Sequence, residues 1–138
     1  MAWLDDIVTA LQAAGVGTLN ADIFVSSRAV VPVLASGFAT ISIKSTPGTS
    51  PENTHNSTTR PAYLQPGAQI LVRADDWEEA ETKALAAYSA LYQVQNEFIN
   101  SGWYKWIRPT QEPFDMGLDA RGQQQQVAFN VIGNYNKR

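Results

Sequence analysis

The most constraining feature of the sequence is a long central stretch with a single helical periodicity, RADDWEEAETKALAAYSALYQVQNEFINSG. Asp76 stands where a helix cap is expected, with Glu79 three residues later, and Asn100 followed by Gly102 resembles a stop signal. These signals predict one helix over about residues 76–100. At about 1.5 Å per residue such a helix is about 40 Å long, so it would cross a whole sheet.

A row of apolar residues follows this predicted helix at alternating spacings of three and four. The row consists of Trp77, Ala80, Ala84, Ala87, Leu91, Val94 and Phe98. One interpretation is a heptad seam that receives a partner helix. The favoured one is a thin stripe lying against a sheet, because alanines allow close approach and so few heptads cannot separate a period of 3.5 from 3.6.

Shorter patterns surround this helix. Trp3, Leu4, Ile7, Val8 and Leu11 predict an amphipathic first helix over about 2–14. Apolar and β-branched runs predict strands over 22–27, 29–34, 39–44, 69–74, 103–108 and 123–134. Pro32 confines the second of these strands to an edge or a bulge. The segment FDMGLDARG, from Phe114 to Gly122, is predicted to be a turn that joins two strands.

The predicted elements indicate an α+β protein with an α/β-like arrangement in two layers. We expect a mixed, mostly antiparallel β-sheet with two helices packed on it, one of them long. A chain of 138 residues suits a single domain over 1–138. Because the chain has no cysteine, its stability must come from packing and not from disulfides.

The stretch from Ser45 to Pro61 contains no Val, Leu, Ile, Met, Phe, Tyr or Trp. Compact domains rarely keep a connection longer than about 12 to 15 residues without structure of its own, and those that persist are functional or disordered. We therefore predict a polar, flexible loop over 45–61. Its two interpretations are an arm that becomes ordered against a neighbouring subunit, which we favour, and a surface loop without a role.

The sequence offers little catalytic chemistry. Its single histidine, His55, lies in the polar loop, where nothing would fix its tautomer, and the acidic residues around Asp76 suit a helix start. No loop ends in the Gly-Lys-Ser/Thr of a phosphate-binding motif. We expect no catalytic residues, no cofactor and no metal, and hence no enzyme.

Charge and hydropathy limit the partners. The net charge of -3 and the pI near 5.0 argue against a protein that grips the phosphate backbone of nucleic acid. The first residues are acidic where a signal peptide is basic, and no apolar run reaches the about 20 residues of a membrane span. We therefore expect a protein made and kept in a cytoplasm, with no membrane partner.

The order of these elements resembles the small tail-completion proteins of long-tailed bacteriophages and prophages, which include tail terminators and other minor capsid proteins of head-tail joining. The resemblance rests on DIF after the first helix, RP before QILVRADDWEEAETKALAAYSAL, and IRPTQEPFDMGLDARGQQQQVAFNV near the end. It covers most of the chain. It implies a structural virion protein, assembled in the bacterial cytoplasm, that forms a ring, usually of six copies, on the head-proximal end of the tail tube.

As the resemblance implies, the partners are further copies of the chain, the tail tube protein and the head connector or stopper protein, while genomic DNA passes through without tight binding. Two alternatives remain open. The chain could be a neck protein of the same particles, a stopper or adaptor, which binds the portal side. It could also be a small α/β enzyme or ligand-binding domain whose pocket carries no motif.

Arginine and aromatic side chains dominate interface hot spots, and this suggests which residues join subunits. The candidates are Arg60 at the end of the polar loop, Arg73 at the end of a strand, and Trp106 with Arg108 in WYKWIR. Strict alternation in that strand would place Trp103 with Ile107 on one face, and Tyr104 with Trp106 and Arg108 on the other. A strand buried on both faces is the favoured interpretation, and an exposed interface is the alternative.

Overall fold

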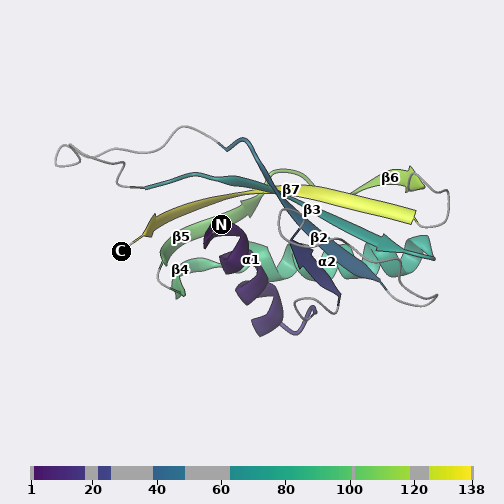
Figure 1. The fold of residues 1–138 in the computed structure, drawn as a ribbon, viewed down its shortest axis with the longest axis horizontal. Helices are drawn as coiled ribbons and strands as arrows, with labels where there is room; N and C mark the ends of the chain where they lie inside the picture. The colour runs from purple at the N-terminus through teal and green to yellow at the C-terminus, as the bar shows by residue number, and fades with distance from the viewer. Residues whose placement is uncertain are drawn as a thin grey trace.

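The fold of this chain is a mostly antiparallel, mixed sheet with two helices, as the sequence predicted at the level of α+β class. The computed structural model describes residues 2–17, 22–25, 39–48, 63–100, 102–118 and 125–137. The helices are α1 (Ala2–Ala13) and α2 (Trp77–Tyr92). The strands are β1 (Ile23–Val25), β2 (Thr40–Thr46), β3 (Gly67–Ala74), β4 (Gln95–Ile99), β5 (Gly102–Pro109), β6 (Phe114–Leu118) and β7 (Gln125–Lys137) (Figure 1).

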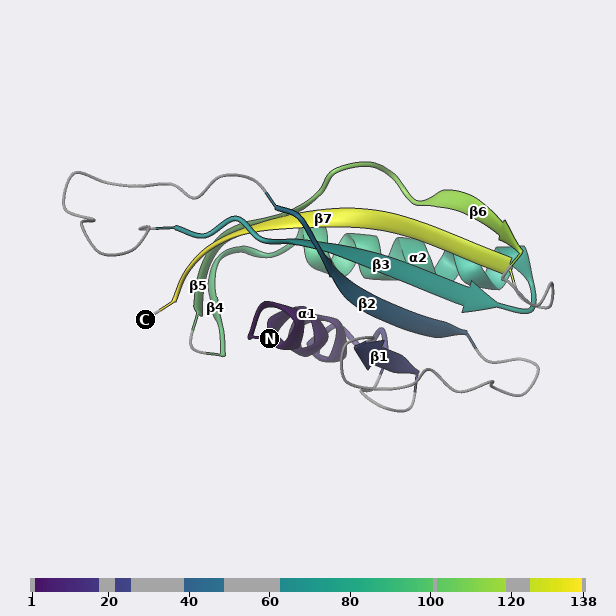
Figure 2. The ribbon, with the colours of Figure 1, turned by 45° about the horizontal axis from the view of Figure 1, so that its top comes forward.

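The seven-stranded sheet is organised around β7, its longest strand. The strand order is β1-β2-β3-β7-β5-β4, and β6 also pairs with β7. Along one edge β7 pairs with β3, and along the other it pairs first with β6 and then with β5. Only β1, which is parallel to β2, departs from the antiparallel pattern among the described strands. Figure 2 shows β7 running the length of the molecule between β3 and β6.

Helix α2 packs on one face of the sheet through its alanines. Ala80, Ala84, Ala87 and Leu91 are all fully buried, and Tyr88 meets the ring of Phe129 edge-on, with centroids 5.7 Å apart. On β3 and β7 the same face carries alternate apolar residues, because successive side chains of a strand point to opposite sides. Those residues are Ala68, Ile70, Val72, Val127, Phe129 and Val131. The predicted alanine stripe is confirmed.

Helix α1 has the predicted bounds and is held to the same face by Trp3. The indole Nε1 of Trp3 donates a buried hydrogen bond of 3.1 Å to the carbonyl oxygen of Gly67. Its ring packs on Gly133 of β7, where an added Cβ would lie 2.5 Å from Trp3 Cζ3. Only glycine therefore allows this close approach of helix and strand.

Helix α2 is shorter than predicted. Asp76 is the cap, with its Oδ1 accepting from the Glu78 amide at 3.3 Å, but the helix ends at Tyr92 and spans about 24 Å. Residues 95–99 instead form β4, which pairs with β5, so Val94 and Phe98 are not part of a helical row. Asn100, with φ of 54°, sits in the connection between these two strands. Asparagine adopts this left-handed conformation in hairpin turns as well as at helix ends, so the stop signal was misassigned.

Two other predictions fail locally. A β-bulge between Tyr104 and Trp106 breaks the alternation, so Tyr104 lies with Ile107 on the helix-covered face and Trp106 lies with Arg108 on the other. The predicted turn from Phe114 contains strand β6, which runs to Leu118 and pairs with β7. The predicted strand over 29–34 lies outside the described residues.

The polar loop connects β2 and β3, which pair as an antiparallel hairpin. Its first residues, Ser45 and Thr46, belong to β2, and Thr46 is in register with Gly67. The two ends meet closely, since a Cβ on Gly48 would lie 1.9 Å from the Gln65 carbonyl oxygen. Residues 49–62, with His55 and Arg60, lie outside the described part of the chain.

Candidate interaction surfaces

Trp106 and Arg108, two of the predicted interface residues, form a stacked pair on β5. The Arg108 guanidinium carbon lies 4.2 Å from the centroid of the Trp106 ring, within the range of a cation–π contact. Arg108 is exposed and Trp106 is partly buried, so this side of β5 is not closed off. The favoured interpretation of a strand buried on both faces is therefore wrong, and the alternative of an open aromatic and arginine surface fits better.

A groove of about 630 Å³ follows this pair along the sheet edge. It opens where β4 begins, because β4 pairs with β5 only up to the Gln95–Trp106 row. Beyond that row, β5 pairs with β7 on one side and has none of the described strands on the other. Tyr92, the last residue of α2, forms one wall of the groove, and Lys105 lies nearby with its Nζ 4.9 Å from the Tyr63 ring centroid. The groove combines aromatic rings with two cationic side chains.

Arg73 does not join this pair. It lies near the end of β3 in register with Thr40 and Gln126, half-buried, and its Nε is buried with no hydrogen-bond partner in the described part of the chain. Arg108 is in register with Ile132, six residues further along β7 than Gln126. At about 3.4 Å per residue the two arginines are about 20 Å apart, so Arg73 is not part of the contact between Trp106 and Arg108.

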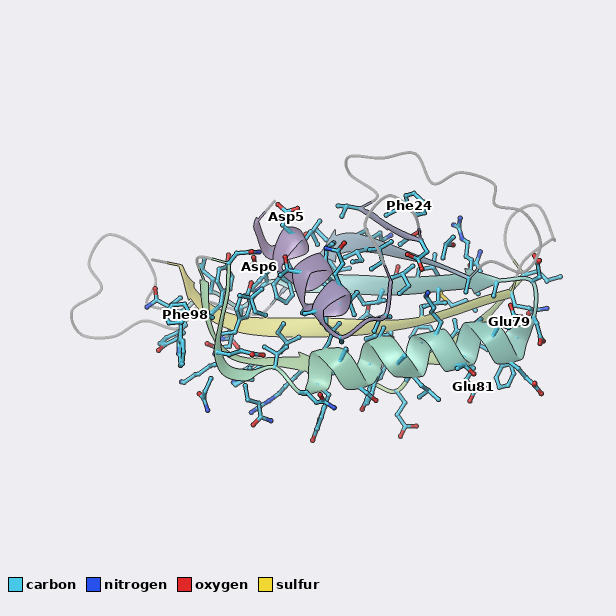
Figure 3. All side chains as sticks on the ribbon, turned by 90° about the horizontal axis from the view of Figure 1, so that it is seen from below. Asp5, Asp6, Phe24, Glu79, Glu81 and Phe98 are labelled. Atoms are coloured by element: carbon cyan, nitrogen blue, oxygen red, sulfur yellow. The ribbon has the colours of Figure 1, made fainter. Side chains whose placement is uncertain are left out.

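The outer side of α2 carries large exposed apolar side chains. Trp77, Leu85 and Tyr92 are 42%, 46% and 57% exposed. All three lie on the same face of the helix as Glu81, by helical spacing. The side chain of Glu81 projects away from α1 and β2 (Figure 3). The aromatic ring of Tyr92 stacks on that of Tyr88. At about 100° per residue this stripe lies about a quarter turn of the helix away from the buried face formed by Ala80, Ala84, Ala87 and Leu91.

Strand β6 carries a second group of exposed apolar residues that the sequence analysis missed. Phe114, Met116 and Leu118 are 39%, 45% and 55% exposed. The signal was present in the sequence, because apolar residues at every second position are typical of a strand. The glycine and the aspartates of FDMGLD are also typical of turns, and they led to the prediction of a turn. An open edge strand with apolar side chains is a surface prone to association.

Acidic residues surround the start of α2. Asp75, Asp76, Glu78 and Glu79 are exposed there, where the positive end of the helix dipole favours them. One turn further, Lys83 forms an ion pair of 2.9 Å with Asp22. The predicted role of these carboxylates as helix-start residues is consistent with this geometry.

Beneath α1 lies a closed polar cluster. Asp6 is 4% exposed and accepts hydrogen bonds from the Tyr104 hydroxyl and, at 2.7 Å, from Asn100 Nδ2. Burial, followed by the hydrogen bond to Asp6, raises the pKa of Tyr104 far above its usual range. Burial and the Asp6 charge also raise the pKa of Tyr135. Asp6, Asn100 and Tyr104 are thus linked by hydrogen bonds inside the chain.

Among the described residues, no cluster of three or more potential metal-ligating side chains is close enough to bind a metal ion. None of the described helices has the length and apolarity needed to cross a membrane. Searches of the sequence against protein-family models and against curated proteins both give no match.

Proposed function

We propose that this chain is a structural protein of a bacteriophage particle that assembles into a ring, caps the tail tube and joins it to the head connector. The observation that carries the proposal is the combination of the resembling element order with uncovered aromatic, apolar and arginine side chains on α2, β5 and β6. Exposed apolar patches on small proteins commonly mark sites of protein contact. The proposed virion location follows from this role.

The fold suits a ring subunit in its rigidity. We further propose that the sheet and the helices form two layers, in which α2, the longer helix, packs against β3, β7 and β5 from one side. A braced sheet can hold contact surfaces at fixed angles, and closed rings require the same angle between every pair of subunits. The polar segment 45–61 is proposed to be the arm that orders against a neighbour.

The proposed ring surrounds DNA during genome passage without holding it tightly. A net charge of -3 gives little general attraction for phosphate, so we expect no strong duplex binding at physiological salt. Submicromolar affinity with a steep dependence on salt concentration would contradict this part of the proposal.

Electron microscopy of the purified protein, alone and mixed with tail tubes, tests the proposal. We expect closed rings in solution or ring density at one end of the tubes. Density on isolated portal or connector complexes, and none on tubes, would reassign the chain to the stopper or adaptor class. Monomers by light scattering at all concentrations, with bare tube ends, would refute the ring, and a metabolite retained in native mass spectrometry would favour a ligand-binding domain.

A further inference from the structure

Two exposed surfaces at opposite ends of α2 are complementary in charge. The first, which we call the acidic surface, consists of the exposed Trp77 and Glu78 and the partly buried Glu81 at the start of α2, together with the exposed Leu118 at the end of β6. The end of β6 lies at the start of α2 because Leu118 is in register with Gln125 of β7, which is in register with Ala74 just before the helix. Figures 1 and 2 show these segments meeting at one end of the molecule.

The second surface, which we call the basic surface, is the groove beside Trp106. It consists of Tyr92, Lys105, Trp106 and Arg108. Tyr92 is the last residue of α2 and Trp77 the first, so the two surfaces are separated by about 22 Å of helix. They therefore cannot contact each other within one molecule.

We propose that the acidic surface of one copy docks on the basic surface of the next, so that copies join head to tail. Each surface has exposed aromatic or apolar side chains for burial, and the opposite charges at their rims fix which surface meets which. Contact of either surface with itself would place like charges together, so a symmetric pairing of that kind is disfavoured. A head-to-tail contact is heterologous and closes into a ring when its rotation divides a full turn. The inference rests on the proposed function only in taking the neighbour to be another copy.

Charge reversal on each surface tests the pairing. One variant combines Glu78→Lys with Glu81→Lys, and the other combines Lys105→Glu with Arg108→Glu. Each variant brings like charges together at the contact, so we expect self-association at least about thirtyfold weaker than that of the native chain in light scattering. Glu97→Lys is the matched control, because Glu97 is exposed on β4 beside α1 and outside both surfaces, and it should assemble normally.

Mixing gives the decisive measurement. An equimolar mixture of the two variants restores opposite charges at every contact, and so does one chain that carries all four substitutions. Both samples should recover the assembly that the separate variants lose. Recovery also rules out misfolding, because an unfolded variant cannot be rescued by a partner that bears a different change, and circular dichroism of each variant checks the same point.

The outcomes separate the two proposals. Native rings that persist in both reversed variants overturn the assignment of these surfaces and leave the ring intact. Loss of tube binding with unchanged self-association assigns the surfaces to the tube protein and also overturns the inference. Recovery on mixing that stops at dimers supports the surface pairing but refutes the ring, and a native chain that is monomeric at all concentrations refutes both.

Discussion

The aromatic residues of this chain occupy two environments that differ in how their polar atoms are satisfied. Under α1, the rings of Trp3, Tyr104 and Tyr135 are buried and stacked, and the indole N–H of Trp3 and the hydroxyl of Tyr104 donate hydrogen bonds within the chain. At the ends of α2, the rings of Trp77 and Tyr92 are about half exposed. The rings of the first group are already buried within the chain. The rings of the second group expose apolar area to water, which association with another protein would cover.

This comparison separates residues that build the fold from residues available for contact. Composition alone cannot make the distinction, because both groups contain tryptophan and tyrosine. Burial together with internal hydrogen bonding can, since a buried Trp or Tyr normally finds a partner for its polar atom. The following predictions contrast the two groups, from the largest expected effect on stability to the smallest.

Trp3→Ala should have the largest effect on folding. The substitution removes a fully packed ring and its hydrogen bond to Gly67, so we expect a loss of about 3 to 5 kcal/mol in the free energy of unfolding. Trp77→Ala is the matched control, because the same change at a 42% exposed site should cost less than about 1 kcal/mol. Urea denaturation of both variants measures the difference. Equal losses would show that the two environments do not differ as described.

The same contrast explains how far the sequence could be interpreted. Helix α1 and the buried face of α2 were predictable, because apolar residues at helical spacing reflect burial directly. The end of α2 was not, because Asn100 serves equally well in a hairpin and at a helix end. Only the pairing of β4 with β5, a tertiary contact, decides between them.

The candidate surfaces were predictable in part for a related reason. Residue type alone was enough to select Trp106 and Arg108, but the bulge that turns both toward the open face has no signature in WYKWIR. The apolar residues at every second position of β6 indicated a strand, but the glycine and aspartates of the same segment indicated a turn. Asp6 illustrates a further limit, because its partners Asn100 and Tyr104 are almost a hundred residues away along the chain.

Tyr104→Phe should destabilise the closed cluster by about 1.5 to 3 kcal/mol, because the buried Asp6 loses a hydrogen-bond donor and the ring packing stays. Tyr92→Phe is the control, since its ring is exposed and the change should fall within about 0.5 kcal/mol. Thermal unfolding monitored by circular dichroism compares the two. A neutral Tyr104→Phe would mean that Asp6 does not depend on this hydroxyl.

The pKa of Tyr104 also predicts a dependence of stability on pH. The pKa of Tyr104 is higher in the folded chain than the value of about 10 in the unfolded chain. The protonated hydroxyl therefore makes its full contribution to the free energy of unfolding below about pH 10, and this contribution is lost as the pH rises further. Stability of the native protein should therefore fall above about pH 10. Tyr104→Phe should reduce the slope, and the part due to Tyr135, whose pKa is raised as well, should remain. Denaturation at pH 9, 10 and 11 provides the measurement, and a flat profile would contradict it.

Gly133→Ala tests the approach of α1 to the sheet. The new Cβ would lie 2.5 Å from Trp3 Cζ3, so helix or ring must shift, at a cost of about 1 to 3 kcal/mol. In a Trp3→Ala background the clash is absent and the cost should largely disappear, which a double-mutant cycle measures as a coupling energy. Additive losses would show that Gly133 acts through its own backbone and not through Trp3.

Arg108→Ala should have the smallest effect on folding stability. It tests most directly whether the exposed residues of the basic surface serve in association. The side chain is exposed and its contact with Trp106 contributes only about 0.5 to 1 kcal/mol at such sites, so the melting temperature of the monomer should barely change. If the basic surface joins subunits, removal of an interface arginine should cost about 2 kcal/mol or more of association energy. Arg108→Lys, which keeps the charge but loses the planar group that stacks on Trp106, should lie between the native chain and Arg108→Ala. Sedimentation velocity and thermal unfolding of both variants give the two energies separately. A drop in melting temperature with unchanged assembly would show that Arg108 stabilises the fold, as the buried aromatic residues under α1 do. It would also remove the basis for treating β5 as a contact surface.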